Sequence, residues 1–128
     1  MQHWSEKYVG EAGQGERPCW QLLRRVWLEV AGVELPSFEE NKDGIGTLAR
    51  EAMAFSDVPF GQEQPLDAVF MNTDIQVKSK WIVAEAHIGI CVKPGLVLHV
   101  ERGTLAMIEP MKHMRVTRIK AGPWHHAR

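Results

Sequence analysis

The hydrophobic positions in the first third of the chain recur at helical spacing. They lie three or four residues apart, on one face of an α-helix: Leu22, Leu23, Val26, Trp27 and Val30. Pro18 precedes this segment and Gly32 follows it, and these residue types are favoured where helices begin and end. The pattern therefore predicts a helix over residues 19–31, with Cys19 in its first turn. A second, shorter helix is predicted over residues 47–55.

From residue 66 onward the apolar period becomes strand-like. The predicted strands cover residues 66–71, 81–92, 96–101, 105–108 and 114–120. Lys93, Pro94 and Gly95 form a tight turn by composition, so the second and third strands should pair as a hairpin. One helix followed by a run of strands predicts an α+β fold: an N-terminal helix carrying the cysteine, packed on an antiparallel sheet of about five strands.

Composition and charge place the chain among ordinary globular proteins. It has 128 residues, of which 45% are hydrophobic and 24% charged, and we expect a single domain over residues 1–128. Its formal net charge of -1 gives no broad basic surface for nucleic acid. We expect no membrane partner, since no apolar run approaches the ~20 residues of a membrane helix. We also expect no cofactor.

The cysteine content and the N-terminus suggest where the protein is made. Cys19 and Cys91 are too few for a disulfide framework, which indicates a reducing compartment. The N-terminus has no basic region followed by an apolar run, so we expect cytoplasmic synthesis without a signal peptide.

Cys19 is the first candidate for chemistry. The N-terminus of a helix carries a partial positive charge, and this favours a thiolate over a thiol. A thiolate becomes a useful catalyst when a base lies close to it, and the chain offers six histidines for that role.

His87 and His99 are the best-placed histidines, because they flank the predicted hairpin turn. Alternation puts His87 on one face of its strand with Cys91, and His99 on the matching face of the return strand with Val97. The opposite faces are purely aliphatic and should meet the core. Both histidines would then share the other face, where the start of the Cys19 helix could dock. A cysteine and a histidine oriented by a third polar group form the arrangement of a cysteine hydrolase.

Simpler interpretations of these residues stay open at this point. Cys19 could be a small buried hydrophobe, and the two histidines half-buried strand residues. Cys19, His87 and His99 could also hold zinc, since the three side chains would converge. Cys91 is interpreted as a structural thiol. The remaining histidines near the C-terminus are interpreted as solvated: His113, His125 and His126.

Several stretches of the chain, in order, resemble the NlpC-type family of cell-wall peptidases, and most closely its phage-tail-associated branch. The similar stretches are Lys7-Tyr-Val-Gly10, Cys19-Trp-Gln-Leu-Leu-Arg-Arg-Val-Trp27, Gly32-Val-Glu-Leu-Pro36, Leu66-Asp-Ala-Val-Phe70, His87-Ile-Gly-Ile90 and Leu98-His99. Together they span most of the chain.

This resemblance implies a papain-like α+β fold and a thiol protease without a metal or other cofactor. It carries over Cys19 as nucleophile, His87 as base and His99 as the residue that orients His87. The implied reaction is hydrolysis of an amide bond in peptidoglycan stem peptides. The implied partners are that substrate and, for a phage or prophage protein incorporated in a tail, other tail proteins.

The chain also departs from the family pattern. Pro18 stands where an acidic residue is usual, and Gln21 where a small residue is usual. Ala12 and Gly13 replace a Pro-Tyr pair whose tyrosine lies near the active site. These departures favour, as an alternative, a non-catalytic or weakly active tail-assembly module. A third hypothesis is that the same nucleophile transfers an acyl group to an acceptor other than water.

The resemblance therefore does not assign the residues that contact the oxyanion and the substrate. The backbone amide of Cys19 and the side chain of Gln14 are candidate oxyanion donors. Trp20 either lines a substrate groove or packs in the core.

Overall fold

A computed structural model describes residues 3–13, 15, 17–35 and 56–122. The predicted helix over residues 47–55 lies outside these ranges, as do Gln14, His125 and His126. The described chain begins with a short 3-10 helix, η1 (Trp4–Lys7). None of the helices within these ranges is long and apolar enough to cross a membrane.

The predicted helix forms over its full length, but its last part is widened. It consists of α1 (Pro18–Val26) followed directly by the π-helical segment η2 (Trp27–Ala31). Gly32 ends it with φ of 70°, the left-handed conformation that glycine adopts at little cost. The indole Nε1–H of Trp27 donates a 2.9 Å hydrogen bond to the Leu66 carbonyl, which ties the helix to the chain entering the sheet.

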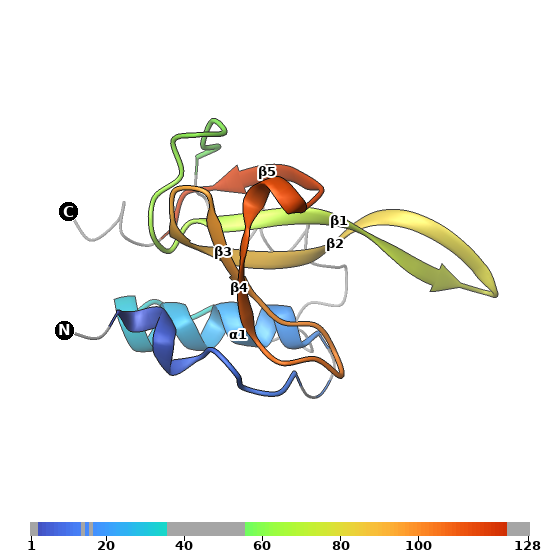
Figure 1. Ribbon diagram of the computed structural model, residues 1–128, viewed down its shortest axis with the longest axis horizontal. Helices are drawn as coiled ribbons and strands as arrows, with labels where there is room; N and C mark the ends of the chain where they lie inside the picture. Colours follow the sequence, from blue (N-terminus) through green and yellow to red (C-terminus); the bar gives the residue numbers. More distant parts are fainter. Residues whose placement is uncertain (1–2, 14, 16, 36–55, 123–128) are drawn as a thin grey trace.

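Five antiparallel strands form one sheet in the order β4-β3-β2-β1-β5 (Figure 1). Their bounds are β1 (Ala68–Val77), β2 (Lys80–Lys93), β3 (Leu96–His99), β4 (Met107–Pro110) and β5 (Val116–Lys120). A short 3-10 helix, η4 (Met111–His113), links β4 to β5. The α+β class, the five strands and the hairpin at residues 93–95 are thereby confirmed.

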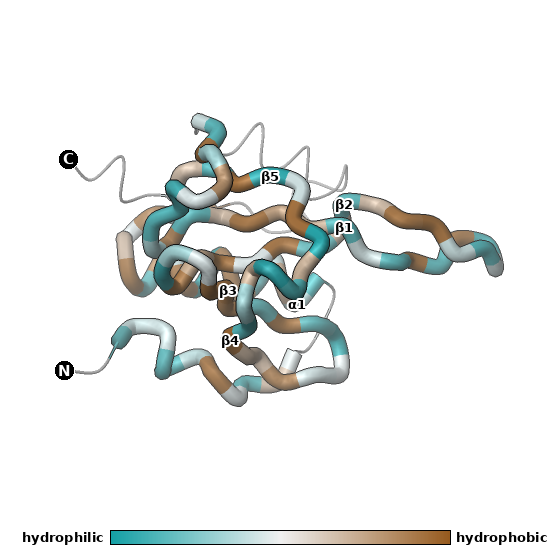
Figure 2. The backbone as a smooth tube through the Cα atoms, turned by 45° about the horizontal axis from the view of Figure 1, so that its top comes forward, coloured by the Kyte–Doolittle hydropathy of each residue, from teal (hydrophilic) through white to brown (hydrophobic). Residues whose placement is uncertain are grey.

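The first two strands are longer than the sequence pattern predicted. β1 and β2 pair from Ala68–Ile90 out to Val77–Lys80, and the outer part of this hairpin projects from the body as an arm (Figure 1). The sequence pattern predicts no strand over residues 72–80, because a free two-stranded arm has no buried face to impose alternation. Part of the arm is nevertheless hydrophobic (Figure 2), with Trp81 and Val83 exposed.

Two clusters of buried side chains cover the two faces of the sheet. The helix-side cluster joins the helix to the aliphatic residues of β2 and β3, and it includes Trp20, Leu23, Trp27, Ile88, Ile90, Leu98 and Val100. The opposite cluster consists of Val69, Met71, Cys91, Val97 and Ile119. The prediction that the aliphatic faces of the hairpin meet the core is confirmed.

The position of the helix corrects one expectation. The helix packs on the aliphatic face of the sheet, and Cys19 itself belongs to the helix-side cluster. The expectation that its start docks on the histidine face is therefore wrong. The large apolar surface of Ile88, Ile90 and Leu98 attracts the apolar face of the helix more strongly than a face carrying two imidazoles.

Candidate active site

Cys19 lies in the first turn of α1, at the wall of a pocket of about 590 Å³. The residue before the helix, Arg17, has a left-handed backbone with φ of 53°, which turns the chain sharply into Pro18. Three segments line the pocket: the helix start (Arg17, Pro18, Cys19), the adjoining parts of β1 and β2 (Thr73, Asp74, Ile75, Ala86, His87) and the chain after β3 (Val100, Glu101, Arg102).

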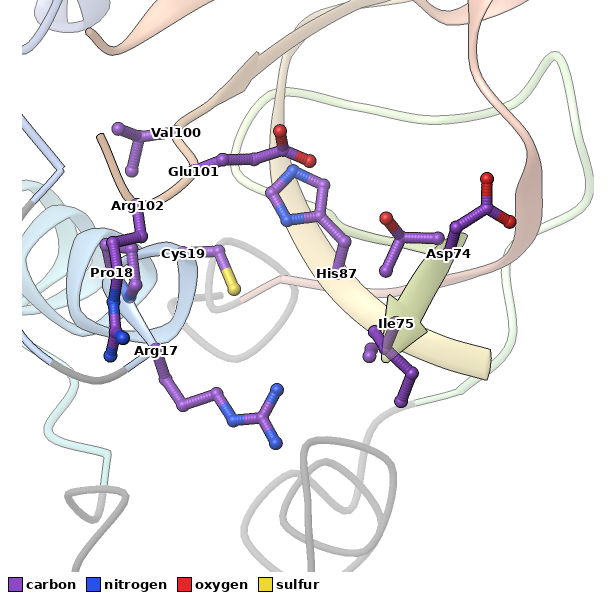
Figure 3. A pocket seen from close by; sticks show the side chains of 11 residues that line it. Arg17, Pro18, Cys19, Asp74, Ile75, His87, Val100, Glu101 and Arg102 are labelled. Carbon is purple, nitrogen blue, oxygen red and sulfur yellow. The ribbon is translucent and has the colours of Figure 1, made fainter. Parts of the chain in front are cut away.

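His87 reaches this pocket from β2. Figure 3 shows the Cys19 sulfur and the His87 ring projecting into the pocket from opposite sides. The β1–β2 register shifts beside His87: Met71 pairs with His87 and Thr73 with Ala84, so two residues of β2 face Asn72 alone. A bulge of this kind bends a strand and redirects the side chains next to it.

His87 and His99 contact each other directly. Nε2 of His87 lies 2.9 Å from Nδ1 of His99, and the two rings meet edge to face at 74°. Nδ1 of His87 is therefore the ring nitrogen left for the pocket and for Cys19. The structure brings together the three residues that the sequence singled out, with His99 on the far side of His87 from the pocket.

The electrostatic environment of Cys19 differs from the expectation. Burial raises the pKa of its thiol, and this outweighs the lowering by backbone N–H groups of Ile88 and Trp20 and by the charge of Arg17. The residue as a whole is only 6% exposed. The expectation of a sulfur held ionised by the helix start is therefore wrong for the resting protein, because desolvation exceeds the stabilisation that the first turn supplies.

His87 is also neutral at rest. Burial, and after it the charge of the neighbouring His99, lowers its pKa to about 4. At neutral pH the pair is thus a thiol and an imidazole. An uncharged imidazole with a free lone pair is able to accept a proton, which is the requirement for a general base.

The loop at Gly13 explains one departure from the family pattern. The amide of Gly13 donates to the Thr104 carbonyl at 2.8 Å. A Cβ at this position would lie 2.2 Å from the carbonyl oxygen of Glu101. Because the two segments approach so closely, no tyrosine fits here, and the tyrosine of the family pattern has no equivalent at this position.

Of the other candidate contacts from the sequence, Trp20 does not line the pocket. Gln14, the proposed oxyanion donor, lies outside the described residues. Trp20 is fully buried in the helix-side cluster, so it packs in the core and does not line a substrate groove. The backbone amide of Cys19, in the first turn of α1, is the oxyanion candidate that the described chain retains.

Cys91 lies on the other face of the sheet. It is fully buried, and its thiol donates to the Lys93 carbonyl at 3.2 Å. Burial, followed by the charges of Asp67 and Glu63, raises its pKa to about 12. A thiol with this pKa is unreactive at neutral pH, as the structural interpretation predicted.

The zinc alternative is not supported by the geometry. Within the described ranges, no three His, Cys, Asp or Glu side chains are placed to hold a metal ion. His99 directs Nδ1 to His87 and Nε2 towards Glu109, and not to a point shared with Cys19. His113 lies exposed at η4, away from this pair.

Charged residues at the pocket were not singled out from the sequence. Arg17 and Arg102 line one side with the helix start, while Asp74 and Glu101 also border the cavity (Figure 3). Arg17 directly precedes Pro18-Cys19 in the sequence, and this position could have indicated that it lies near the candidate nucleophile. Asp74 comes from the arm, whose position only the folded sheet determines.

Comparison with known proteins assigns no family. No protein-family model matches the chain, and no curated protein matches its sequence.

Proposed function

We propose that this protein is a papain-like cysteine peptidase or amidase that hydrolyses an amide bond in peptidoglycan stem peptides. Cys19 is the nucleophile, His87 the general base and His99 the residue that orients His87. One observation carries the proposal: Cys19 and His87 face the same pocket, while His99 engages the far nitrogen of His87 at 2.9 Å.

The reaction starts from a neutral pair. Nδ1 of His87 accepts the proton of the Cys19 thiol as the sulfur attacks the amide carbonyl, giving a tetrahedral oxyanion and an imidazolium. The backbone amide of Cys19 donates a hydrogen bond to that oxyanion. His87 then gives its proton to the leaving amine, and a thioester to Cys19 remains. Water, deprotonated by His87, hydrolyses the thioester and releases the carboxylic acid and the thiol.

The pocket charges support a peptide substrate of this class. Arg17 and Arg102 provide positive charge, and Asp74 and Glu101 provide negative charge, around one cavity. Stem peptides carry both free carboxylates and an ammonium group, so a pocket of mixed sign suits them. The resemblance to the phage-tail-associated branch supports a role in a phage or prophage tail that acts on the cell wall.

The decisive experiment is digestion of purified peptidoglycan fragments, with products identified by mass spectrometry. Wild type should release peptide fragments and Cys19→Ala should release none. Cys91→Ala is the matched control and should retain activity, because Cys91 is buried away from the helix and does not line the pocket. Equal release by wild type and Cys19→Ala would exclude Cys19 from the mechanism.

A second candidate is a non-catalytic tail-assembly module with the same fold. It is favoured by the projecting β1–β2 arm, on which Trp81 is 70% and Val83 58% exposed, since exposed apolar residues of this size favour a protein contact. Absence of any release by wild type would favour this candidate. Trp81→Ser should then reduce association with tail proteins in sedimentation experiments, while Cys19→Ala should not.

A further inference from the structure

The far nitrogen of His99 is a buried polar atom in need of a partner. Nε2 of His99 is buried and, among the described residues, makes no ordinary hydrogen bond. The carboxylate of Glu109 lies nearby, with its Oε2 3.4 Å from this nitrogen. Leaving a buried ring nitrogen without a hydrogen bond costs free energy. A separation of 3.4 Å is compatible with Glu109 as the partner, because hydrogen bonds at catalytic sites are often long before the substrate binds.

The sheet register places Glu109 there. On the β3–β4 pair, Val97 is opposite Glu109 and His99 is opposite Met107. Directly opposed residues share a face, and so do residues two apart on one strand, so Glu109 and His99 are diagonal neighbours on the same face. The Glu109 side chain is partly exposed, at 34%, whereas that of His99 is 14% exposed. The carboxylate thus lies at the outer end of a row formed by Glu109, His99, His87 and Cys19.

The tautomer of His99 decides whether His87 can act as a base. Two neutral imidazoles whose nitrogens are 2.9 Å apart share one proton between those nitrogens. If Nδ1 of His99 carries it, Nε2 of His87 accepts, and the proton of His87 then sits on Nδ1, facing Cys19. If Nε2 of His99 carries its proton, Nδ1 of His99 accepts from Nε2–H of His87, and Nδ1 of His87 keeps its lone pair for the thiol.

We propose that Glu109 is a positioning residue that selects the second arrangement. A carboxylate beside Nε2 of His99 favours a proton on that nitrogen, which makes Nδ1 of His99 an acceptor. His87 is thereby held with Nε2–H towards His99 and with its basic nitrogen towards Cys19. This inference rests on the proposed hydrolase function for its catalytic consequence, but the tautomers themselves exist whether or not the protein is an enzyme.

The first test reads the tautomers directly, by long-range ¹H–¹⁵N NMR of the histidine rings at neutral pH. Wild type should show His87 and His99 both protonated on Nε2. Glu109→Ala should shift His99 towards protonation on Nδ1, whereas Glu109→Gln, whose amide oxygen can still accept, should keep the wild-type signature. Glu6→Gln, an exposed glutamate in η1, is the charge-matched control and should change neither ring. Unchanged tautomers in Glu109→Ala, or Nδ1 protonation in wild type, would overturn the proposal.

The second test uses peptidoglycan fragments. Glu109→Ala should lower kcat about 10-fold or more with little change in KM, and Glu109→Gln should recover most of that loss. If Glu109→Ala and Glu109→Gln lose activity equally, the positioning role is wrong. If wild type shows the expected tautomers but no hydrolysis, the hydrolase function fails while the role of Glu109 in setting the tautomers stands.

Discussion

His87 and His99 form a hydrogen-bonded pair between two strands, with Nε2 of the first 2.9 Å from Nδ1 of the second. They are not directly opposite each other, since the β2–β3 register pairs Ile90 with Leu98 and so brings Gly89 opposite His99. The two histidines are therefore diagonal neighbours across β2 and β3, in a register set near the hairpin turn, where the pairing shifts between Cys91 and Lys93.

Replacing His99 should weaken catalysis without removing it. In His99→Ala, Nε2 of His87 loses its acceptor and the ring loses its orientation, so kcat should fall by about 10- to 100-fold. His99→Asn should retain more activity, because its amide oxygen can accept from Nε2–H. Steady-state rates on peptidoglycan fragments, compared after a urea-unfolding check of each variant, measure this effect. Equal rates for His99→Ala and wild type would remove His99 from the site.

The buried His87 should make the protein sensitive to acid. Its pKa is about 4 in the folded state and ~6.5 when unfolded, so between these values the unfolded chain binds more protons. The contribution of His87 to stability is therefore complete above pH ~6.5 and is lost as the pH falls towards 4, by up to about 3 kcal/mol. His87→Gln should show a flatter decline in the free energy of unfolding between pH 7 and pH 4.5 in urea titrations.

A histidine control isolates that effect. His113 is exposed in η4, so His113→Gln should follow the wild-type decline. If His87→Gln and His113→Gln decline in parallel with wild type, His87 does not resist protonation in the folded state.

Cys19 should react slowly with alkylating agents at neutral pH. Since burial raises its pKa, labelling by iodoacetamide should accelerate only at or above the ~8.5 of a free cysteine. The measurement is made in Cys91→Ala, so that Cys19 is the thiol that reacts. A fast reaction that is already complete at pH 6 would show a thiolate stabilised by the helix start, contrary to the structure.

Gly13→Ala should destabilise the protein. The new Cβ would lie 2.2 Å from the carbonyl oxygen of Glu101, and this backbone oxygen cannot move without shifting a pocket wall. We expect a loss of about 1–3 kcal/mol in the free energy of unfolding, typical of overpacking. Gly10→Ala, where no atom lies within 4 Å, carries only the strain of its positive φ and should cost less. A larger loss for Gly10→Ala would contradict the close approach at Gly13.

The sequence by itself determined the local elements of this protein. The three- and four-residue spacing of apolar side chains located the helix, and strand alternation separated the aliphatic faces of β2 and β3 from the faces that carry the histidines. These patterns are readable because each depends on residues close in sequence. The same reasoning singled out Cys19, His87 and His99, although only the fold shows that they are neighbours.

The tertiary structure alone decided what these residues experience. The raised pKa of Cys19 arises from burial against strands about 70 residues away, which no helix pattern reveals. The burial of Trp20, the projecting arm and the approach of Glu109 to His99 likewise depend on how distant segments pack. Burial and electrostatics are properties of the assembled sheet and helix, so they become defined only when the chain is folded.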